Sequence, residues 1–149
     1  VVGAATPSQA RRVIDENLLN PARFFSAHPI ATVGVEDPRF ELRMWRGPTW
    51  NSMTYWAARG CVRYGYEGAA CQLLERALDA TTVQFERTGT VWEFYHPHAG
   101  QPEDLQRKPQ TPFNSPCCDY LGHNPLIAMA YLYEECRMKN DECRMWNDE

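Results

Sequence analysis

Two short segments concentrate residue types that can do chemistry. The first, Trp45-Arg-Gly-Pro-Thr-Trp-Asn51, places two Trp, one Arg and one Asn around a Gly-Pro turn. Indole faces stack on the C–H faces of a sugar ring, while Arg and Asn donate hydrogen bonds to hydroxyl groups. The same pattern fits a structural role, in which Trp45 and Trp50 fill a core and Arg46 pairs with an acidic side chain. The residue types alone leave both interpretations open.

The second segment, Val91-Trp-Glu-Phe-Tyr-His-Pro-His-Ala-Gly100, holds one carboxylate, Glu93, between large aromatic side chains. Such a setting is typical of a working general acid or base. In a first alternative, Glu93 forms an ion pair with an arginine such as Arg46 and has only a structural role. In a second alternative, Glu93, His96 and His98 supply three metal ligands, although no further ligand is evident.

The cysteines follow neither the spacing of a metal site nor that of a required disulfide framework. Cys61 and Cys71 fall among apolar neighbours, where a cysteine acts as a small buried hydrophobe. The adjacent Cys117 and Cys118 have His123 nearby as a possible co-ligand, but no C-x-x-C spacing supports a metal site. We therefore expect no metal and no other cofactor, and the thiol pattern favours a cytoplasmic location.

Composition excludes several classes of protein. The 149 residues are 44% hydrophobic and 23% charged, as expected for one globular domain. The longest apolar run, around 126–133, is far shorter than the roughly 20 residues of a membrane-spanning helix. Net charge is −4 with Lys and Arg scattered, so no nucleic-acid partner is expected. The chain opens on Val1 without a signal segment, which we interpret as a trimmed or partial product.

Helices joined by long loops are predicted to position both segments. Thr6-Pro-Ser-Gln9 is typical of a capping box with proline at the first helical position. Periodic apolar residues continue this helix until Asn20-Pro21 ends it. Segments 24–48 and 86–121 lack periodicity and are rich in Pro and Gly, so we expect long loops with at most short strand pieces.

Three further helices follow from the apolar periodicity. Two of them, over about 50–64 and 67–85, are joined by a tight turn and form an antiparallel hairpin. The fourth begins after Asn124-Pro125 and extends through Tyr133. The predicted apolar stripes of the hairpin are Met53, Trp56, Ala57, Cys61 and Tyr64, and Ala70, Leu73, Leu74, Ala77, Leu78 and Thr81.

The end of the chain contains a near-duplication of seven residues, Glu135–Asp141 followed by Glu142–Asp148. Two copies are too few for a coiled coil, and Asn-Asp pairs disfavour helix. We therefore expect a frayed polar tail over 135–149 and place the globular domain at 1–134.

Three motifs occur in a fixed order: Trp45-Arg-Gly-Pro-Thr-Trp-Asn51, Gly60-Cys-Val-Arg-Tyr-Gly-Tyr66 and Gly89-Thr-Val-Trp-Glu-Phe-Tyr95. Together they resemble the C-terminal catalytic part of glycoside hydrolase family 63, over about residues 18–134. That family and its relatives, the trehalases and the glucosylglycerate and mannosylglycerate hydrolases, adopt an (α/α)6 toroid and cleave α-glycosidic bonds with inversion. The resemblance implies an all-α fold in which residues 1–134 form the C-terminal arc of such a toroid, as helical hairpins joined by long aromatic-rich loops.

The resemblance also assigns roles. Glu93 matches the general base, which in an inverting glycosidase activates a water while an acid about 6.5–9.5 Å away protonates the leaving oxygen. No segment matches the Asp motif that supplies this acid, and neither Asp37 nor Asp119 is assigned to it. The candidate substrate-binding residues are Trp45, Arg46, Trp50, Asn51, Trp92 and Tyr95.

The expected function is therefore inverting hydrolysis of an α-glucoside or α-mannoside of a small or oligosaccharide substrate. A toroid of twelve helices needs roughly 190 residues, so the missing N-terminal part of the barrel is an expected partner. The isolated chain is expected to show little or no activity, because a general acid contributes roughly 10²–10⁴-fold. The alternative is a non-catalytic carbohydrate-binding or structural remnant of such a domain.

Overall fold

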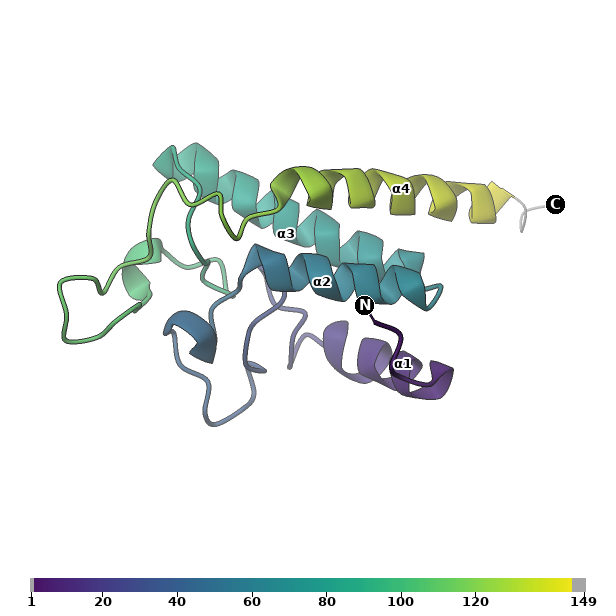
Figure 1. Ribbon diagram of the computed structural model, residues 1–149, viewed down its shortest axis with the longest axis horizontal. Helices are drawn as coiled ribbons and strands as arrows, with labels where there is room; N and C mark the ends of the chain where they lie inside the picture. Colours follow the sequence, from purple (N-terminus) through teal and green to yellow (C-terminus); the bar gives the residue numbers. More distant parts are fainter. Residues whose placement is uncertain (1, 146–149) are drawn as a thin grey trace.

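Three long helices lie side by side, and the long loops gather at one end of them (Figure 1). This computed structural model describes residues 2–145, with the backbone alone for 141–145. Within these residues the chain forms helices and isolated β-bridges but no strands, which confirms the all-α prediction. The α-helices are α1 (Pro7–Val13), α2 (Asn51–Arg63), α3 (Glu67–Thr88) and α4 (Leu126–Met145).

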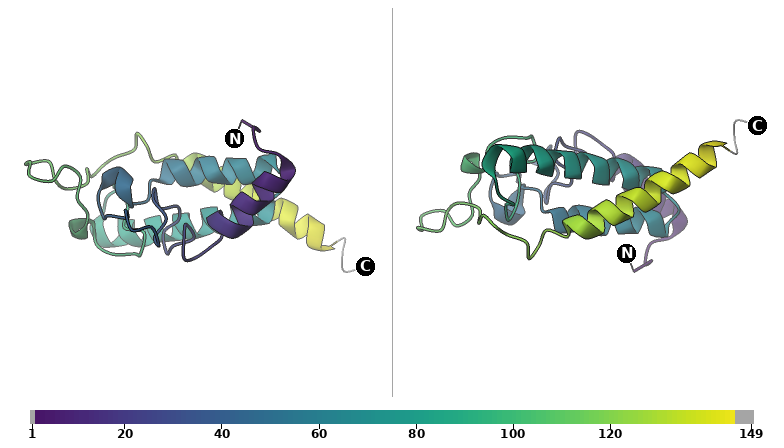
Figure 2. Two further views of the ribbon diagram at one scale, coloured as in Figure 1. Left: turned by 90° about the horizontal axis from the view of Figure 1, so that it is seen from below. Right: turned by 90° about the horizontal axis from the view of Figure 1, so that it is seen from above.

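Helices α2 and α3 form the predicted antiparallel hairpin, and α4 packs on α3 and crosses the pair at an angle (Figure 2). The stripe predicted for α3 faces this interior, where Leu73 and Leu74 are fully buried. The main core joins side chains of α2, α3 and α4 to Ile14 and Ile30. Among these, Cys61 and Cys136 are buried thiols whose pKa values burial raises to about 11, so both stay protonated and inert.

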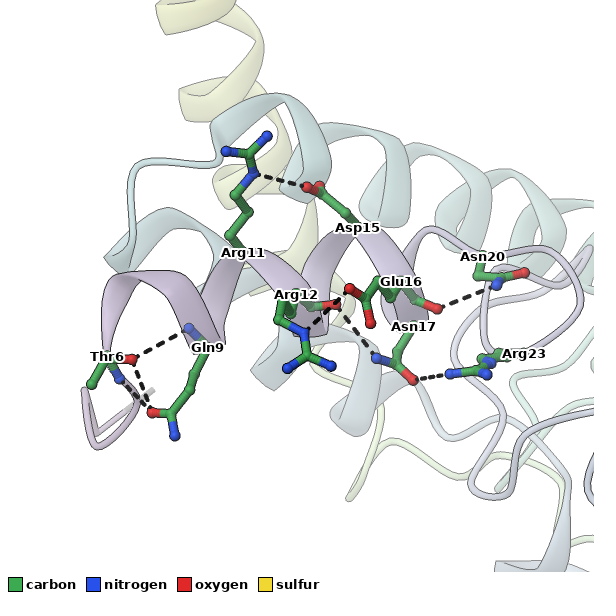
Figure 3. Close-up of polar contacts among 9 residues, drawn as sticks. All are labelled: Thr6, Gln9, Arg11, Arg12, Asp15, Glu16, Asn17, Asn20 and Arg23. Atoms are coloured by element: carbon green, nitrogen blue, oxygen red, sulfur yellow. Dashed lines mark hydrogen bonds and ion pairs between the residues drawn. The ribbon is translucent and has the colours of Figure 1, made fainter.

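Helix α1 begins at the predicted capping box (Figure 3). The Thr6 hydroxyl accepts a hydrogen bond from the Gln9 N–H at 3.3 Å, and Gln9 Oε1 accepts one from the Thr6 N–H at 2.8 Å. These bonds satisfy two N–H groups that have no partner within the helix. After α1 the chain continues into one π-helical turn, Ile14–Leu18, and only Ala10 and Ile14 of the two elements are buried.

The buried face of α2 differs from the prediction. Met53 and Trp56 of the predicted stripe are 43% and 50% exposed. Polar side chains take the interior positions instead, since the Thr54 hydroxyl donates to the Pro29 carbonyl at 2.6 Å and accepts from a backbone N–H. Apolar periodicity cannot locate a face whose buried members are polar and hydrogen-bonded. The buried residues of α2 are Asn51, Thr54, Ala58 and Cys61.

Helix α4 is longer than predicted. It starts at Leu126, directly after the expected Asn124-Pro125, and continues through residue 134 to Met145. The expectation of a frayed tail is therefore wrong for residues 135–145. Packing explains the difference, because Cys136 is 1% exposed and joins the main core. The rest of the predicted tail, 146–149, lies outside the described residues, and the domain division at residue 134 stays a prediction.

None of the described helices combines the length and the apolar character that spanning a bilayer requires.

Candidate active site

The carboxylate of Glu93 lies inside the loop end of the molecule, with 2% of its side chain exposed. Arg107 donates hydrogen bonds to both of its oxygens, from Nε to Oε2 at 2.6 Å and from Nη2 to Oε1 at 3.3 Å. The backbone N–H of Cys117 adds a third hydrogen bond to Oε2 at 3.3 Å. The bond to Glu93 raises the pKa of Arg107, which therefore stays charged. Sequence reasoning named Arg46 as a possible partner of Glu93, and that choice is wrong.

Backbone pairing joins the two chemistry-bearing segments. Thr49 and Tyr95 exchange two N–H···O=C bonds of 2.9 Å each, and Thr49 also forms a bridge with Ala31. The Thr49 hydroxyl is buried and donates to the carbonyl of His28 at 2.6 Å. These pairings are isolated β-bridges, where at most short strand pieces were expected in the loops. They fix the segment that carries Glu93 against the segment that carries the two tryptophans.

Trp45 and Trp50 stack face to face, with ring centroids 3.8 Å apart and planes 7° apart. Trp50 is 2% exposed and packs with Phe94 and Leu105 in a second, smaller core, so its role is structural. Trp45 is 45% exposed, which leaves indole surface open to solvent. Gly47 permits this arrangement, because a Cβ there would collide with the Glu41 carbonyl oxygen. Of the two tryptophans, Trp45 is the one available to stack on a sugar.

Arg46 is half exposed and pairs with Glu41, its Nη2 lying 3.0 Å from Oε1. Arg43 contacts the second oxygen of Glu41 at 3.0 Å. The structural alternative, in which Arg46 pairs with an acidic side chain, therefore describes this geometry. Arg46 still lies beside Trp45 in the sequence, at the surface, where its remaining N–H groups can reach a ligand.

Asn51 is fully buried and connects several loops. Its Oδ1 lies 2.9 Å from Nε2 of His28, and its Nδ2 donates to Thr81 at 3.0 Å and to Oδ1 of Asn124 at 2.9 Å. Asn124 in turn donates to the carbonyl of Trp92 at 2.7 Å. Every polar group of the Asn51 amide is engaged within the protein, so its predicted contact with sugar is not visible in this geometry.

Trp92 and Tyr95, which flank Glu93 in the sequence, are held by hydrogen bonds within the protein. The Trp92 indole N–H donates to the Thr88 hydroxyl at 3.0 Å, and the Tyr95 hydroxyl accepts from the Trp92 backbone N–H at 3.2 Å. Burial raises the pKa of Tyr95 to about 12. The Tyr95 ring lies 4.6 Å from that of His28, whose pKa burial lowers to about 4. His28 is therefore a neutral interior side chain at pH 7.

The two carboxylates left unassigned have different surroundings. Asp37 accepts side-chain hydrogen bonds from Arg39 at 2.9 and 2.7 Å, which lower the pKa of Asp37 to about 2. A general acid must carry a proton at the working pH, so Asp37 does not fit that role. Asp119 accepts a hydrogen bond from the Thr90 hydroxyl at 2.9 Å at an exposed position.

Among the side chains of residues 2–140, neither of the two possible sets of metal ligands is assembled. Across residues 2–140, whose side chains are described, no three His, Cys, Asp or Glu side chains gather as metal ligands. Glu93 is engaged by Arg107, and Nδ1 of His96 accepts the backbone N–H of His98 at 3.0 Å. The backbone N–H of Cys117 donates to Glu93, and desolvation together with the neighbouring Glu93 carboxylate raises the pKa of the Cys117 thiol.

Sequence reasoning missed three residues that build this site: Arg107, His28 and Asn124. His28 and Arg107 lie in the aperiodic loops, Asn124 was named only at the start of the fourth helix, and each reaches its partner across at least 14 residues of sequence. The proline that follows His28 and Asn124 was the one local sign of a fixed backbone at those positions. No comparable sign marks Arg107.

Antiparallel helical hairpins, with aromatic-rich loops gathered at one end around a buried carboxylate, define the class: the described residues form an arc of an (α/α)6 glycoside hydrolase domain. Compared with known families, the chain matches the mannosylglycerate hydrolase MGH1-like glycoside hydrolase domain over residues 1–114. The chain belongs to this family. The match confirms the resemblance drawn from the three motifs, and it spans Glu93, Arg107 and the tryptophan segment.

Proposed function

We propose that this chain is the C-terminal part of an inverting α-glycosidase and that Glu93 is its general base. The observation that carries the proposal is a single buried carboxylate, fixed by Arg107 and the Cys117 N–H and bridged through Thr49–Tyr95 to a solvent-facing tryptophan. A general base must be held in one orientation, and a guanidinium that hydrogen-bonds to both carboxylate oxygens does this. Membership of a glycoside hydrolase family supports this role.

The base must also reach a water. The Glu93 side chain is 2% exposed, whereas that of its partner Arg107 is 20% exposed. The loop that carries Arg107 pairs with the residues just before Trp45, since the Gln106 N–H donates to the Leu42 carbonyl and the Met44 N–H donates to the Gln106 carbonyl. We infer that substrate binding displaces the Arg107 side chain from one Glu93 oxygen and opens that oxygen to the attacking water.

A second candidate function is non-catalytic binding of carbohydrate. One observation favours it: both oxygens of Glu93 are occupied by Arg107, as in a structural ion pair. Trp45 would then stack on the sugar while Arg46 donates to its hydroxyls. Binding without release of product distinguishes this function from hydrolysis.

The remaining helices of the toroid are the proposed partner. An apolar face on α1 and α2, with Val13, Met53 and Trp56 each more than 40% exposed, is available to neighbouring helices. The general acid is proposed to come from those helices. The substrate is proposed to be a neutral or glycerate-linked α-glucoside or α-mannoside, in line with the family name.

The test is a product analysis with the purified chain, alone and together with the N-terminal part of the domain. A panel of α-glucosides and α-mannosides is incubated with each sample, and proton NMR identifies the first anomer released. The β-anomer, lost in Glu93→Gln, is the expected product. Release of the α-anomer, or turnover that Glu93→Gln leaves unchanged, contradicts the assignment.

A further inference from the structure

A groove of about 530 Å³ runs along α3 on the side of the loops 25–28 and 96–99. Its volume lies within the range of about 300–1,000 Å³ that is typical of small-molecule sites. None of the six predicted substrate-binding residues, nor Glu93, lines it. The residues of the groove with polar side chains are His28, Gln72, Glu75, Arg76, Asp79, Gln84, Arg87 and His96.

In this groove, the carboxylate of Asp79 is a hydrogen-bond acceptor without a partner among the described residues. Over residues 2–140, no side chain or backbone N–H bonds to its carboxylate. The nearest cation in sequence, Arg76, is held elsewhere: its guanidinium lies over the Phe25 ring at 3.9 Å and donates to the carbonyls of Phe25 and Ser26. Arg76 and Asp79 therefore line the same groove without pairing.

Arg87 and His96 provide donors. Arg87 uses one guanidinium nitrogen on Gln84, whose own amide nitrogen donates to the Gly100 carbonyl at 3.2 Å. The remaining N–H groups of Arg87 have no partner among the described residues. His96 accepts a backbone hydrogen bond at Nδ1, and burial lowers its pKa, so the neutral ring carries its proton on Nε2. Glycine at position 100 makes room for the His96 ring, because a Cβ there would lie 2.5 Å from Cδ2 of that ring.

The charges of the groove cancel. Arg76 and Arg87 are balanced by Glu75 and Asp79, and His96 is neutral at pH 7. An anion that approached the arginines would meet two carboxylates, and a cation that approached the carboxylates would meet two guanidinium groups. A neutral molecule with several hydroxyl groups meets no such repulsion, because each hydroxyl both donates and accepts.

We propose that this groove is a second binding site, separate from the Glu93 site, and that it takes a neutral sugar or polyol. Hydroxyl groups of the ligand donate to Asp79 and accept from Arg87 and His96. The apolar side chains of Ala80 and Val83, which also line the groove, contact the C–H faces of the ring. The proposal does not depend on the role of Glu93, because it uses different side chains.

The test is an NMR titration of the ¹⁵N-labelled chain with D-glucose and with D-mannose. Phosphate and methylammonium serve as the anionic and cationic comparators. Both sugars are expected to shift the amide resonances of 76–87 and 96–100 saturably, and Asp79→Ala is expected to weaken this binding about tenfold. Glu86→Gln, which changes an exposed carboxylate on α3 outside the groove, is the matched control and should bind as the wild type does.

Absence of saturable shifts in these two segments overturns the proposal, as does binding that Asp79→Ala leaves unchanged. Tighter binding of phosphate or methylammonium than of the sugars also overturns it. Shifts confined to 45–51 overturn the groove site while supporting the proposed function. Glu93→Gln separates the two claims, because it should abolish hydrolysis and leave titration of the groove intact. Arg87→Gln provides a second variant whose binding should weaken in the same direction.

Discussion

Glu93 and Arg107 form an ion pair in which the carboxylate is buried and the guanidinium is 20% exposed. Taking a carboxylate out of water costs several kcal/mol, and that cost is offset here by three hydrogen bonds. Arg46 and Glu41 form a matched comparison, since they are the same two residue types at 3.0 Å with about half of each side chain exposed. Solvent screens that second pair.

Replacing Arg107 by Gln is therefore expected to destabilise the fold by about 3 kcal/mol, because Glu93 is left buried without its counter-charge. Arg46→Gln is the control and is expected to cost less than about 1 kcal/mol. The free energies of unfolding come from urea titrations. If the two substitutions cost the same, the Glu93–Arg107 pair is not what holds the loop that carries Arg107. The double variant Arg107→Gln/Glu93→Gln should recover part of the loss.

His28 makes stability depend on pH. Its pKa is about 4 in the folded chain, against 6.5 for an exposed imidazole, because burial disfavours the charged ring. Between pH 6.5 and pH 4 the unfolded chain takes up a proton that the folded chain does not, so stability falls as the pH falls. The expected loss between pH 7 and pH 4 is about 3 kcal/mol.

Urea unfolding at several pH values, compared between the wild type and His28→Gln, measures this contribution. The variant should show a shallower decline below pH 6.5, whereas His98→Gln, at an exposed histidine, should follow the wild type. Equal slopes for the wild type and His28→Gln would show that the ring titrates normally in the folded state.

For individual residues, the sequence predicted the candidate base, Glu93, but not the side chains that hydrogen-bond to it. Glu93 and Trp45 are recognisable because they stand in dense aromatic motifs. Arg107 and Asn124 are ordinary loop residues until folding brings them to Glu93 and Asn51. Asn51 was expected in a sugar pocket, and the structure places it in an internal hydrogen-bond network. A residue type defines what a side chain can bond to, whereas long-range contacts decide which partner it meets.

Among the helices, α3 was the most predictable. Its apolar stripe is continuous, so burial of Leu73 follows from periodicity alone. Leu73→Ala is expected to cost about 2–5 kcal/mol through the cavity it leaves in the main core. Val83→Ala on the same helix, where the side chain is 60% exposed, should change stability by less than about 0.5 kcal/mol. Thermal or urea unfolding of the two variants gives the comparison, and a small effect at Leu73 would mean that α3 packs loosely.

The other helices show where periodicity stops being informative. In α2 the interior positions are taken by Asn51 and Thr54, which hydrogen-bond to the loops and so turn Met53 and Trp56 toward solvent. In α4 the polar repeat lowered the expectation of helix, but one buried residue, Cys136, keeps the helix on the core. Tertiary packing overrides weak local preferences in both helices.

At the scale of the whole molecule, an apolar surface on α1 and α2 is exposed and available for further packing. Two apolar hollows of about 300 and 510 Å³ flank Trp56, one between α1 and α2 and the other beside Trp45 and Met53. The remaining helices of the toroid are proposed to cover this face. In their absence the chain is expected to self-associate as its concentration rises.

Sedimentation velocity over a range of concentrations checks this expectation. Trp56→Gln should shift the distribution toward the monomer, because it removes the apolar side chain that separates the two hollows. Phe113→Gln is the control, since Phe113 is also exposed, at 66%, but lies on a distant loop. A wild-type chain that stays monomeric throughout, or equal effects of the two substitutions, contradicts the role of this face.

Activation of water by Glu93 is the central claim, and glycosyl fluorides test it most directly. Fluoride leaves without protonation, so the hydrolysis of α-glucosyl and α-mannosyl fluoride needs the base but not the general acid. We expect fluoride release by the wild-type chain with the β-sugar formed first, and a rate at least about 100-fold lower in Glu93→Gln. A wild-type chain that releases no fluoride above the spontaneous rate, or a Glu93→Gln variant that releases it as fast, would contradict this role of Glu93.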